Sequence, residues 1–191
     1  MLFRSLGGDA CNAHAVASIF ATKGRPSFNP LISHVSTSDA AFKLGKKTAL
    51  AECLASHFWP GAMTLILDRS ADCMVSMLTT AGLSKIAVRV PSHPAASQLL
   101  TAFDGPLAAP SANPSGRISP SMAGHVLDGL GGHIDLVLDG GACQSGLEST
   151  IVDCSSDIPV ILRPGGITRD AINDALEKAG HRLLGQNTAS K

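Results

Sequence analysis

Aromatic side chains are scarce in this sequence: among its 191 residues there are one Trp and no Tyr, and aromatics make up 4%. The core must therefore be built from Ala, Leu, Ile and Val, and surfaces that stack bases on aromatic rings are disfavoured. Charge of one sign is also not in excess, because the formal net charge is zero. No overall field attracts the chain to nucleic acid, which leaves only a local basic pocket open.

The sequence also lacks the cysteine patterns of metal and disulfide proteins. Its cysteines are Cys11, Cys53, Cys73, Cys143 and Cys154, an odd number with no C-x-x-C pair. Neither a zinc knuckle nor a disulfide framework is indicated, and a reducing cytoplasm is the expected location. No H-E-x-x-H occurs among the seven histidines, so we expect no catalytic zinc site and no protein-held metal.

Long apolar runs and the common nucleotide-binding motifs are missing as well. No run is long enough to span a bilayer, so a membrane is not an expected partner, and residues 1–5 are too short for a signal peptide. There is no G-x-G-x-x-G. Residues 141–146 come nearest to a phosphate-binding loop, but Leu147 and Glu148 stand where Lys and Ser or Thr are required.

What is present is the composition of a globular domain, with 45% hydrophobic and 16% charged residues, and an alternation of helix and strand patterns. Helices are predicted at 12–23, 48–58, 93–103, from 119 onward and from 168 to 180, with a helical turn at 72–78. Strands are predicted at 31–35, 63–67, 85–90, 107–109, 136–138, 150–153 and 160–162. This succession predicts one α/β domain over residues 1–191, with a twisted sheet and a frayed polar tail.

One early segment sets cations and polar groups between prolines. Arg25 and Asn29 each precede a proline, which biases them toward extended backbone, and Lys23 and His34 flank them. Arg suits phosphate as a fork and Lys suits it as a point charge. The segment therefore predicts an anion site, with a solvated basic loop as the alternative.

Arginines also occur where predicted strands end. Alternation places Lys85 and Arg89 on one face of an otherwise apolar strand, and Arg163 stands directly before a proline. A buried Arg is costly unless it is paired or faces a ligand, so Arg89 is either a salt-bridge partner or a ligand contact. Together with Arg25, these arginines favour a ligand of phosphate type.

A serine-rich loop at 110–119 supplies short hydrogen-bonding side chains. Ser111, Asn113 and Ser119 lie among small residues that permit a close approach of backbone to ligand. Ser119, followed by a proline, is predicted to cap a helix whose N-terminus favours an anion; a simple capped turn is the alternative. Taken singly, His34 and Glu148 are interpreted as ordinary hydrogen-bonded residues.

Together these segments resemble the threonylcarbamoyl-AMP synthase family, which has the YrdC-like fold. The matching stretches are 23–34, 58–65 (FWPGAMTL), 86–94, 110–116, 139–141, 148–150 (EST) and 162–165 (LRPG). They run in family order from about residue 6 to 180. The resemblance implies a twisted, mixed sheet flanked by helices around a concave, positively lined cavity.

The resemblance also implies a reaction, in which L-threonine, bicarbonate and ATP give threonylcarbamoyl-AMP and pyrophosphate, with Mg²⁺ on the phosphates. Such a nucleotidyltransferase supplies the activated donor for threonylcarbamoyladenosine in tRNA, and a separate tRNA-modifying complex completes the transfer. Weak binding of tRNA is a further implied property.

Site residues follow from the resemblance, residue by residue. The implied ATP contacts are Arg25, Asn29, Lys85, Ser111, Ser119 and Arg163. The implied threonine contacts are His34, Arg89, Ala109 and Ser149, and Lys23 and Asn113 are expected to line the cavity. No residue is an evident nucleophile, so catalysis is expected to rest on electrostatic positioning by Lys23, Arg25 and Arg89.

The sequence departs from the family pattern at its start. The family begins with further strands and a Thr-rich segment ending in Tyr-Gly-Leu, whereas this sequence has no Tyr and matches only from Leu6. We therefore expect the N-terminal strands to be missing, and residues 181–191 to be a tail without the linker and second domain of longer members. Two alternatives follow: an RNA-binding module of the same fold, inactive because truncated, and a carbamoyl-adenylating domain of the kind in hydrogenase maturation proteins.

Overall fold

A seven-stranded mixed sheet organises the molecule in the computed structural model, which describes residues 5–141 and 146–181. The strands are β1 (Gly8–Asp9), β2 (Ile32–His34), β3 (Met63–Asp68), β4 (Lys85–Arg89), β5 (Leu107–Ala108), β6 (Thr150–Asp153) and β7 (Val160–Arg163). Their order is β1-β5-β2-β4-β3-β6-β7. The pairs β2/β4 and β3/β6 are parallel and the others antiparallel. The mixed α/β architecture expected from the sequence is confirmed.

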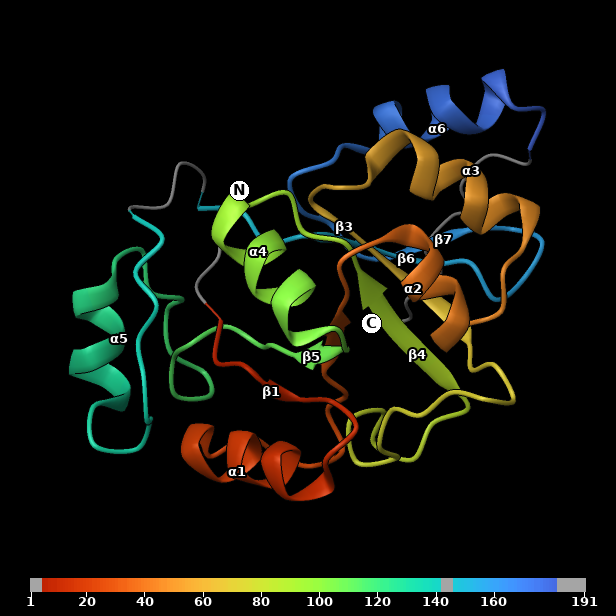
Figure 1. Ribbon diagram of the computed structural model, residues 1–191. Coiled ribbons are helices and arrows are strands. Elements are labelled where there is room, and N and C mark those ends of the chain that lie inside the picture. Colours follow the sequence, from red (N-terminus) through yellow and green to blue (C-terminus); the bar gives the residue numbers. More distant parts are fainter. Residues whose placement is uncertain (1–4, 142–145, 182–191) are drawn as a thin grey trace.

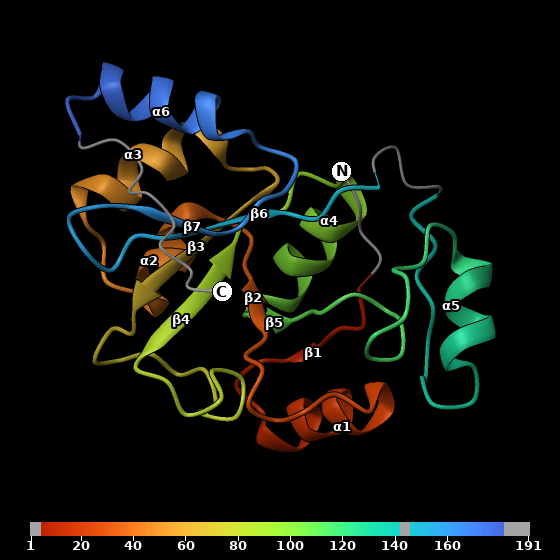
Figure 2. The same cartoon turned by 180° about the vertical axis from the view of Figure 1, so that it is seen from behind.

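Six helices accompany the sheet in the described part of the chain. They are α1 (Ala13–Lys23), α2 (Ser38–Leu44), α3 (Ala49–Phe58), α4 (Pro94–Phe103), α5 (Ala123–Leu130) and α6 (Arg169–Lys178). Helices α2, α3 and α4 lie over one face of the sheet, in front of it in Figure 1. In the opposite view of Figure 2 the strands lie in front of these helices. Helix α5 stands apart from the sheet in both views. The side of the sheet away from α2–α4 is therefore less covered by helices.

The core lies between the sheet and its helices, and it is aliphatic as the composition predicts. Its largest fully buried side chains include Leu54, Met63, Leu65, Ile86 and Ile172. Burying such side chains contributes about 1.5–3 kcal/mol each. The single Trp, Trp59, is also buried, and its indole N–H donates to the carbonyl of Met63 (2.8 Å).

Local signals in the sequence explain the helix ends that were predicted well. Asn12 caps α1, and Gly24 ends it in the left-handed region (φ 57°), where glycine meets no Cβ penalty. Thr48 and Thr168 cap α3 and α6 with their side-chain oxygens. Both helices keep their predicted positions.

Three predicted elements are wrong. The helix expected to begin at Ser119 begins at Ala123 instead, with Met122 at its N-cap and no side-chain cap. Residues 136–138 form no strand and are not part of the described sheet, and Leu136 is 84% exposed, so its apolar side chain is not buried as a core strand would bury it. Residues 72–78 form turns without a helix. The expected frayed tail at 186–191 lies outside the described residues.

Two elements were not predicted at all. Helix α2 is short, and its signal was the capping Thr37, whose hydroxyl accepts from the Ala40 N–H (3.1 Å). Strand β1 has two residues and is defined only by pairing with β5. Among the described residues, no helix is long and apolar enough to cross a membrane. The free thiols described are Cys11, Cys53, Cys73 and Cys154, and Cys143 lies outside.

Candidate active site

A cavity of ≈ 340 Å³ opens where β2 and β4 end and β6 begins. The sequence-predicted residues that line it are Arg25, His34, Arg89, Ala109, Ser111, Ser119, Ser149 and Arg163. They come from the loop after α1, from strand ends and from the loop after β5. The fold thus gathers around one cavity side chains that are up to 138 residues apart in sequence (163 − 25).

Arg25 is aimed by the proline-stiffened segment that follows it. Its Nε donates to the carbonyl of Asn29 (3.3 Å) and its Nη2 to that of Pro30 (3.2 Å). Asn29 does not line the cavity; its main chain instead holds the guanidinium that does. Burial lowers the pKa of Arg25, and the nearby charge of Arg163 lowers it further. An anion at this position would therefore find a preoriented, partly desolvated cation.

His34 and Arg89 are partners in the parallel ladder between β2 and β4, and both are buried. Burial and the charge of Arg89 lower the pKa of His34 to about 3, so its imidazole is neutral at pH 7. Arg89 donates from Nε to the carbonyl of Gly61 (3.1 Å), and burial and the charge of Arg163 lower its pKa to about 10. No ion pair found between described residues includes Arg89. Arg89 is therefore a buried, charged guanidinium that faces the cavity and is not paired with a described carboxylate. Such a group is a strong anion site.

Ser149, directly before β6, joins two strands by hydrogen bonds. Its hydroxyl lies 2.9 Å from Thr64 Oγ1 on β3 and accepts from Arg163 Nη2 at 2.9 Å. Arg163 also donates from Nη2 and Nε to the Ser149 carbonyl (2.9 and 3.2 Å). Its Nη1 forms an ion pair with Glu148 Oε2 (2.6 Å). Arg163 is therefore fixed along most of its guanidinium edge.

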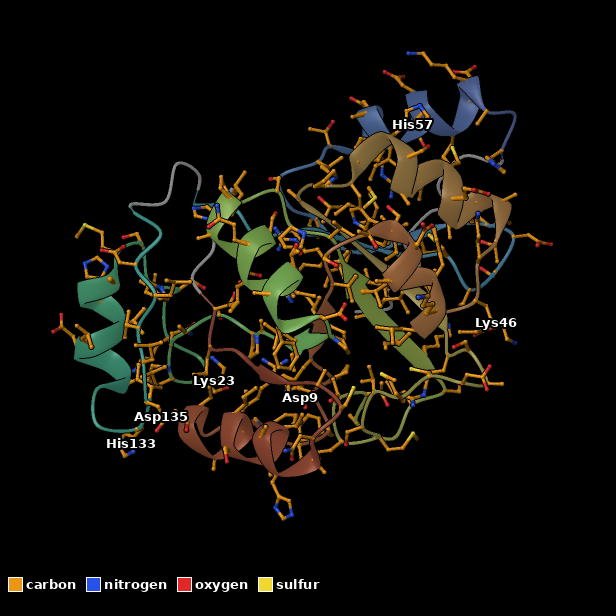
Figure 3. All side chains as sticks on the ribbon, in the orientation of Figure 1. Asp9, Lys23, Lys46, His57, His133 and Asp135 are labelled. Carbon is orange, nitrogen blue, oxygen red and sulfur yellow. The ribbon has the colours of Figure 1, made fainter. Side chains whose placement is uncertain are left out.

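Lys23 lies at the end of α1 that faces the loop after β5 (Figure 3). Its side chain is buried, and the ammonium donates to the carbonyls of Ser111 and Asn113. Burial, followed by the charge of Arg25, lowers its pKa to about 8. Lys23 is not among the cavity-lining residues; it acts on the loop that contributes Ser111.

The loop after β5 is closed on itself as well as on Lys23. Asn113 donates from Nδ2 to the carbonyls of Pro114 (2.9 Å) and Arg117 (2.7 Å), and the Ser115 N–H donates to the Lys23 carbonyl (2.7 Å). Asn113 lines a second hollow of ≈ 440 Å³, between this loop and α5, and not the first cavity. Ser119 lines both. These contacts give the loop a defined shape beside the cavity.

Lys85 is, after Asn29, the second predicted ATP contact that does not line the cavity. It begins β4, whereas Arg89 ends it, and its Nζ pairs with Asp153 Oδ2 (2.9 Å). It is not among the residues that line the cavity. Lys85 and Arg89 thus stand at opposite ends of β4, and of the two only Arg89 lines the cavity.

Two residues important to the site, Thr64 and Gly165, were not singled out from the sequence, and Glu148 was interpreted only as an ordinary hydrogen-bonded residue. Thr64 supports Ser149, Glu148 pairs with Arg163, and Gly165 packs against the backbone of 148–150 so closely that an added Cβ would lie 2.4 Å from the Glu148 carbonyl oxygen. All three stand in or next to stretches that carried the resemblance. Their roles depend on contacts across strands, which the sequence alone does not display.

Carboxylates that could hold a metal are few at this cavity. Glu148 is the one carboxylate among the described lining residues, and Arg163 already engages it. Within residues 5–141 and 146–181 no group of three or more His, Cys, Asp or Glu side chains could hold a metal ion. Among the described residues, the lining of this cavity therefore offers one carboxylate and no cluster of metal ligands.

Comparison with known families fits this set of strand-end arginines and serines. The model of the Sua5/YciO/YrdC family, described as "Telomere recombination", matches residues 4–165. The chain belongs to this family. The expectation drawn from the dispersed motifs is thereby confirmed.

Individual Sua5/YciO/YrdC relatives agree. The threonylcarbamoyl-AMP synthase of Bacillus subtilis is 48% identical over 168 residues, which are 87% of this chain and 48% of that protein. A putative threonylcarbamoyl-AMP synthase of Mycobacterium tuberculosis is 32% identical, over 94% of this chain and 82% of its own. The structure of Pyrococcus abyssi Sua5 complexed with L-threonine superposes with a TM-score of 0.88 at 40% identity, over 98% of this chain and 54% of that one.

The chain spans about half the length of the first of these relatives. The YrdC-like fold itself is shown by the superposition.

Proposed function

We propose that this chain carries a threonylcarbamoyl-AMP synthase activity, forming threonylcarbamoyl-AMP and pyrophosphate from L-threonine, bicarbonate and ATP. The observation that carries the proposal is the convergence of Arg25, Arg89 and Arg163 on one cavity. Two anionic reactants need such a cationic enclosure, and identities of 42–48% to named synthases support the same reaction.

The chemistry requires two steps. The threonine amine condenses with bicarbonate to a carbamate, with loss of water. A carbamate oxygen then attacks the α-phosphorus of ATP and displaces pyrophosphate. Both reacting partners of the second step are anions, so fixed cations reduce their repulsion and stabilise the charge that develops in the transition state.

The residues divide between two subsites in this proposal. Arg25, Arg163, Ser111 and Ser119 hold the nucleotide, while His34, Arg89, Ser149 and the backbone of Ala109 hold threonine or its carbamate. Nδ1 of the neutral His34 donates to the Ile32 carbonyl (3.2 Å), which leaves Nε2 as an acceptor without adding charge. Lys23 and Asn29 act indirectly, through the loop after β5 and through Arg25. Lys85 is assigned to neither subsite in this proposal, because it pairs with Asp153 and does not line the cavity.

Cellular roles follow from the product. Threonylcarbamoyl-AMP is an activated acyl donor, so a separate transferase that modifies tRNA would consume it. A single catalytic domain, the cytoplasmic location and weak tRNA binding remain predictions. The neutral net charge does not favour the RNA-binding module as the main function.

Pyrophosphate release from ATP, Mg²⁺ and bicarbonate, measured with and without L-threonine, tests the proposal. We expect release to depend on threonine, and Arg89→Met to raise the KM for threonine about tenfold or more because a charged hydrogen-bond donor is lost. Arg169→Met, on α6 and outside the cavity, is the matched control. No threonine-dependent release from a chain that circular dichroism finds folded would refute the activity.

A further inference from the structure

Glu148 occupies an unusual position, because it is a carboxylate among the cations of the cavity. Its Oε2 lies 2.6 Å from Arg163 Nη1, and the two side chains are 47% and 36% exposed. Arg163 is one of the proposed phosphate contacts. The same guanidinium group that would bind an incoming phosphate is thus already paired within the chain.

The surrounding charges favour this pairing when the cavity holds no anion. Burial and the charge of Arg163 lower the pKa of Arg25, whereas Glu148 raises it. Burial and Arg25 lower the pKa of Lys23, and Glu148 again raises it. The cations therefore repel one another, and Glu148 offsets part of that repulsion for three of them: Lys23, Arg25 and Arg163.

The backbone of Glu148 is fixed although its side chain is half exposed. The Gly166 N–H donates to the Glu148 carbonyl (2.9 Å). Gly165 packs so closely on the same carbonyl that a Cβ there would lie 2.4 Å from its oxygen. Rotation about the side-chain bonds of Glu148 would move the carboxylate into solvent without moving β6 or β7. Such a rotation costs little compared with a backbone movement.

We infer that Glu148 is an internal counter-ion, which occupies Arg163 in the empty cavity and is displaced by the phosphate chain of the bound nucleotide. This inference rests on the proposed function, since it takes a polyphosphate as the ligand. A phosphate chain carries several negative charges and takes the place of Glu148 at Nη1 of Arg163, whose Nε and Nη2 stay bonded to Ser149, so it outcompetes one carboxylate. Glu148 returns to Arg163 as pyrophosphate leaves.

The consequence is a lower affinity for every polyphosphate, the product included. Glu148 reduces the cost of gathering cations before a ligand arrives, and it limits how tightly pyrophosphate is retained afterwards. Glu148 does not touch reacting atoms in this account. It is a positioning residue that acts through Arg163.

Calorimetric titration with tripolyphosphate, without Mg²⁺ and at low salt, tests the displacement directly. We expect Glu148→Gln to bind tripolyphosphate about two- to fivefold more tightly than the unchanged chain, the range set by a partly exposed ion pair. The gain should shrink as ionic strength rises. Glu148→Asp, which keeps the charge, should show little gain. Glu52→Gln is the matched control, because Glu52 also pairs with a cation at 2.6 Å but lies on α3.

Equal or weaker tripolyphosphate binding by Glu148→Gln would overturn the counter-ion role, as would equal gains in Glu148→Gln and Glu52→Gln. These results are separable from the proposed activity. Threonine-dependent pyrophosphate release with no gain in Glu148→Gln would refute only the counter-ion. A gain in Glu148→Gln without threonine-dependent release would establish the displacement at a polyphosphate site and refute the synthase.

Discussion

The ammonium of Lys23 donates to the main-chain carbonyl of Asn113, 90 residues further along the chain. It donates to the Ser111 carbonyl as well, so one buried cation joins the end of α1 to the loop after β5. Both segments contribute to the cavity, through Arg25 on one side and Ser111 and Ser119 on the other. The relative position of the two proposed nucleotide-binding segments thus depends on a residue that does not line the cavity.

Replacing Lys23 by Met should weaken ATP binding about tenfold and lower the free energy of unfolding by about 1–3 kcal/mol. Two carbonyls lose a charged donor while the apolar stem is kept. ATP titration and urea unfolding measure the two effects. Lys46→Met, an exposed lysine paired at 3.8 Å with Asp68, should change neither. A Lys23→Met variant with unaltered ATP affinity would show that the bonds from Lys23 to the Ser111 and Asn113 carbonyls do not position the nucleotide-binding segments.

The pKa of Lys23 makes the same contact dependent on pH. The group titrates near pH 8 when folded and at its ordinary 10.5 when unfolded, so ATP affinity should fall as the pH rises from 7 to 9. Between pH 8 and 10.5 the unfolded chain holds this proton more tightly, so the Lys23 contribution to stability rises across that window. In Lys23→Met the ATP affinity should not fall between pH 7 and 9. If the ATP affinity of Lys23→Met still falls between pH 7 and 9, another titrating group causes the fall.

Acid should destabilise the fold through His34. Its folded pKa of about 3 lies below the ordinary 6.5, so the unfolded chain binds the proton more tightly between these values. The free energy of unfolding should therefore fall as the pH drops below 6.5, by about 2 kcal/mol between pH 7 and pH 5. Urea unfolding at the two pH values measures this loss. His34→Gln should lose correspondingly less, and an equal loss would argue against the buried neutral imidazole.

The hydrogen bond between Thr64 and Ser149 should matter to threonine binding. Ser149→Ala should raise the KM for L-threonine about tenfold, while Thr64→Val, behind it, should raise that KM less and lower stability by about 1 kcal/mol. A double-mutant cycle should give a coupling of about 0.5–1.5 kcal/mol. Thr80→Val, at a buried threonine bonded to the Met77 carbonyl, is the control. Additive effects of the Thr64 and Ser149 changes would show that the contact is not used.

Close packing at Gly165 should make even an alanine costly. Its Cβ would lie 2.4 Å from the Glu148 carbonyl oxygen and 2.5 Å from the Thr150 nitrogen, both main-chain atoms. Gly165→Ala should therefore destabilise the fold by about 2 kcal/mol or more, seen as a lower midpoint in urea. Gly146→Ala, where nothing lies within 4 Å, should be near neutral. A stable Gly165→Ala chain would mean that the strand junction relaxes freely.

The elements predicted best are those whose signals are local. The caps Asn12, Thr48 and Thr168 and the stop at Gly24 mark helix ends because each satisfies its own backbone neighbours. The wrong or missing predictions concern segments whose structure depends on whether a distant strand lies beside them. Strand β1 exists through its pairing with β5, and 136–138 has a strand composition but no neighbouring strand among the described residues.

The sequence by itself determined the mixed α/β class, the aliphatic core and the set of arginines and serines at strand ends, because each follows from composition or from contacts between near neighbours. Only the tertiary structure decided how these residues are used. The register of β2 and β4 places His34 beside Arg89. Folding of distant segments onto one another brings Lys23 to the Asn113 carbonyl and Lys85 to Asp153. Electrostatic partners are set by distances of a few ångströms across the fold, and those distances arise only when the core has been packed.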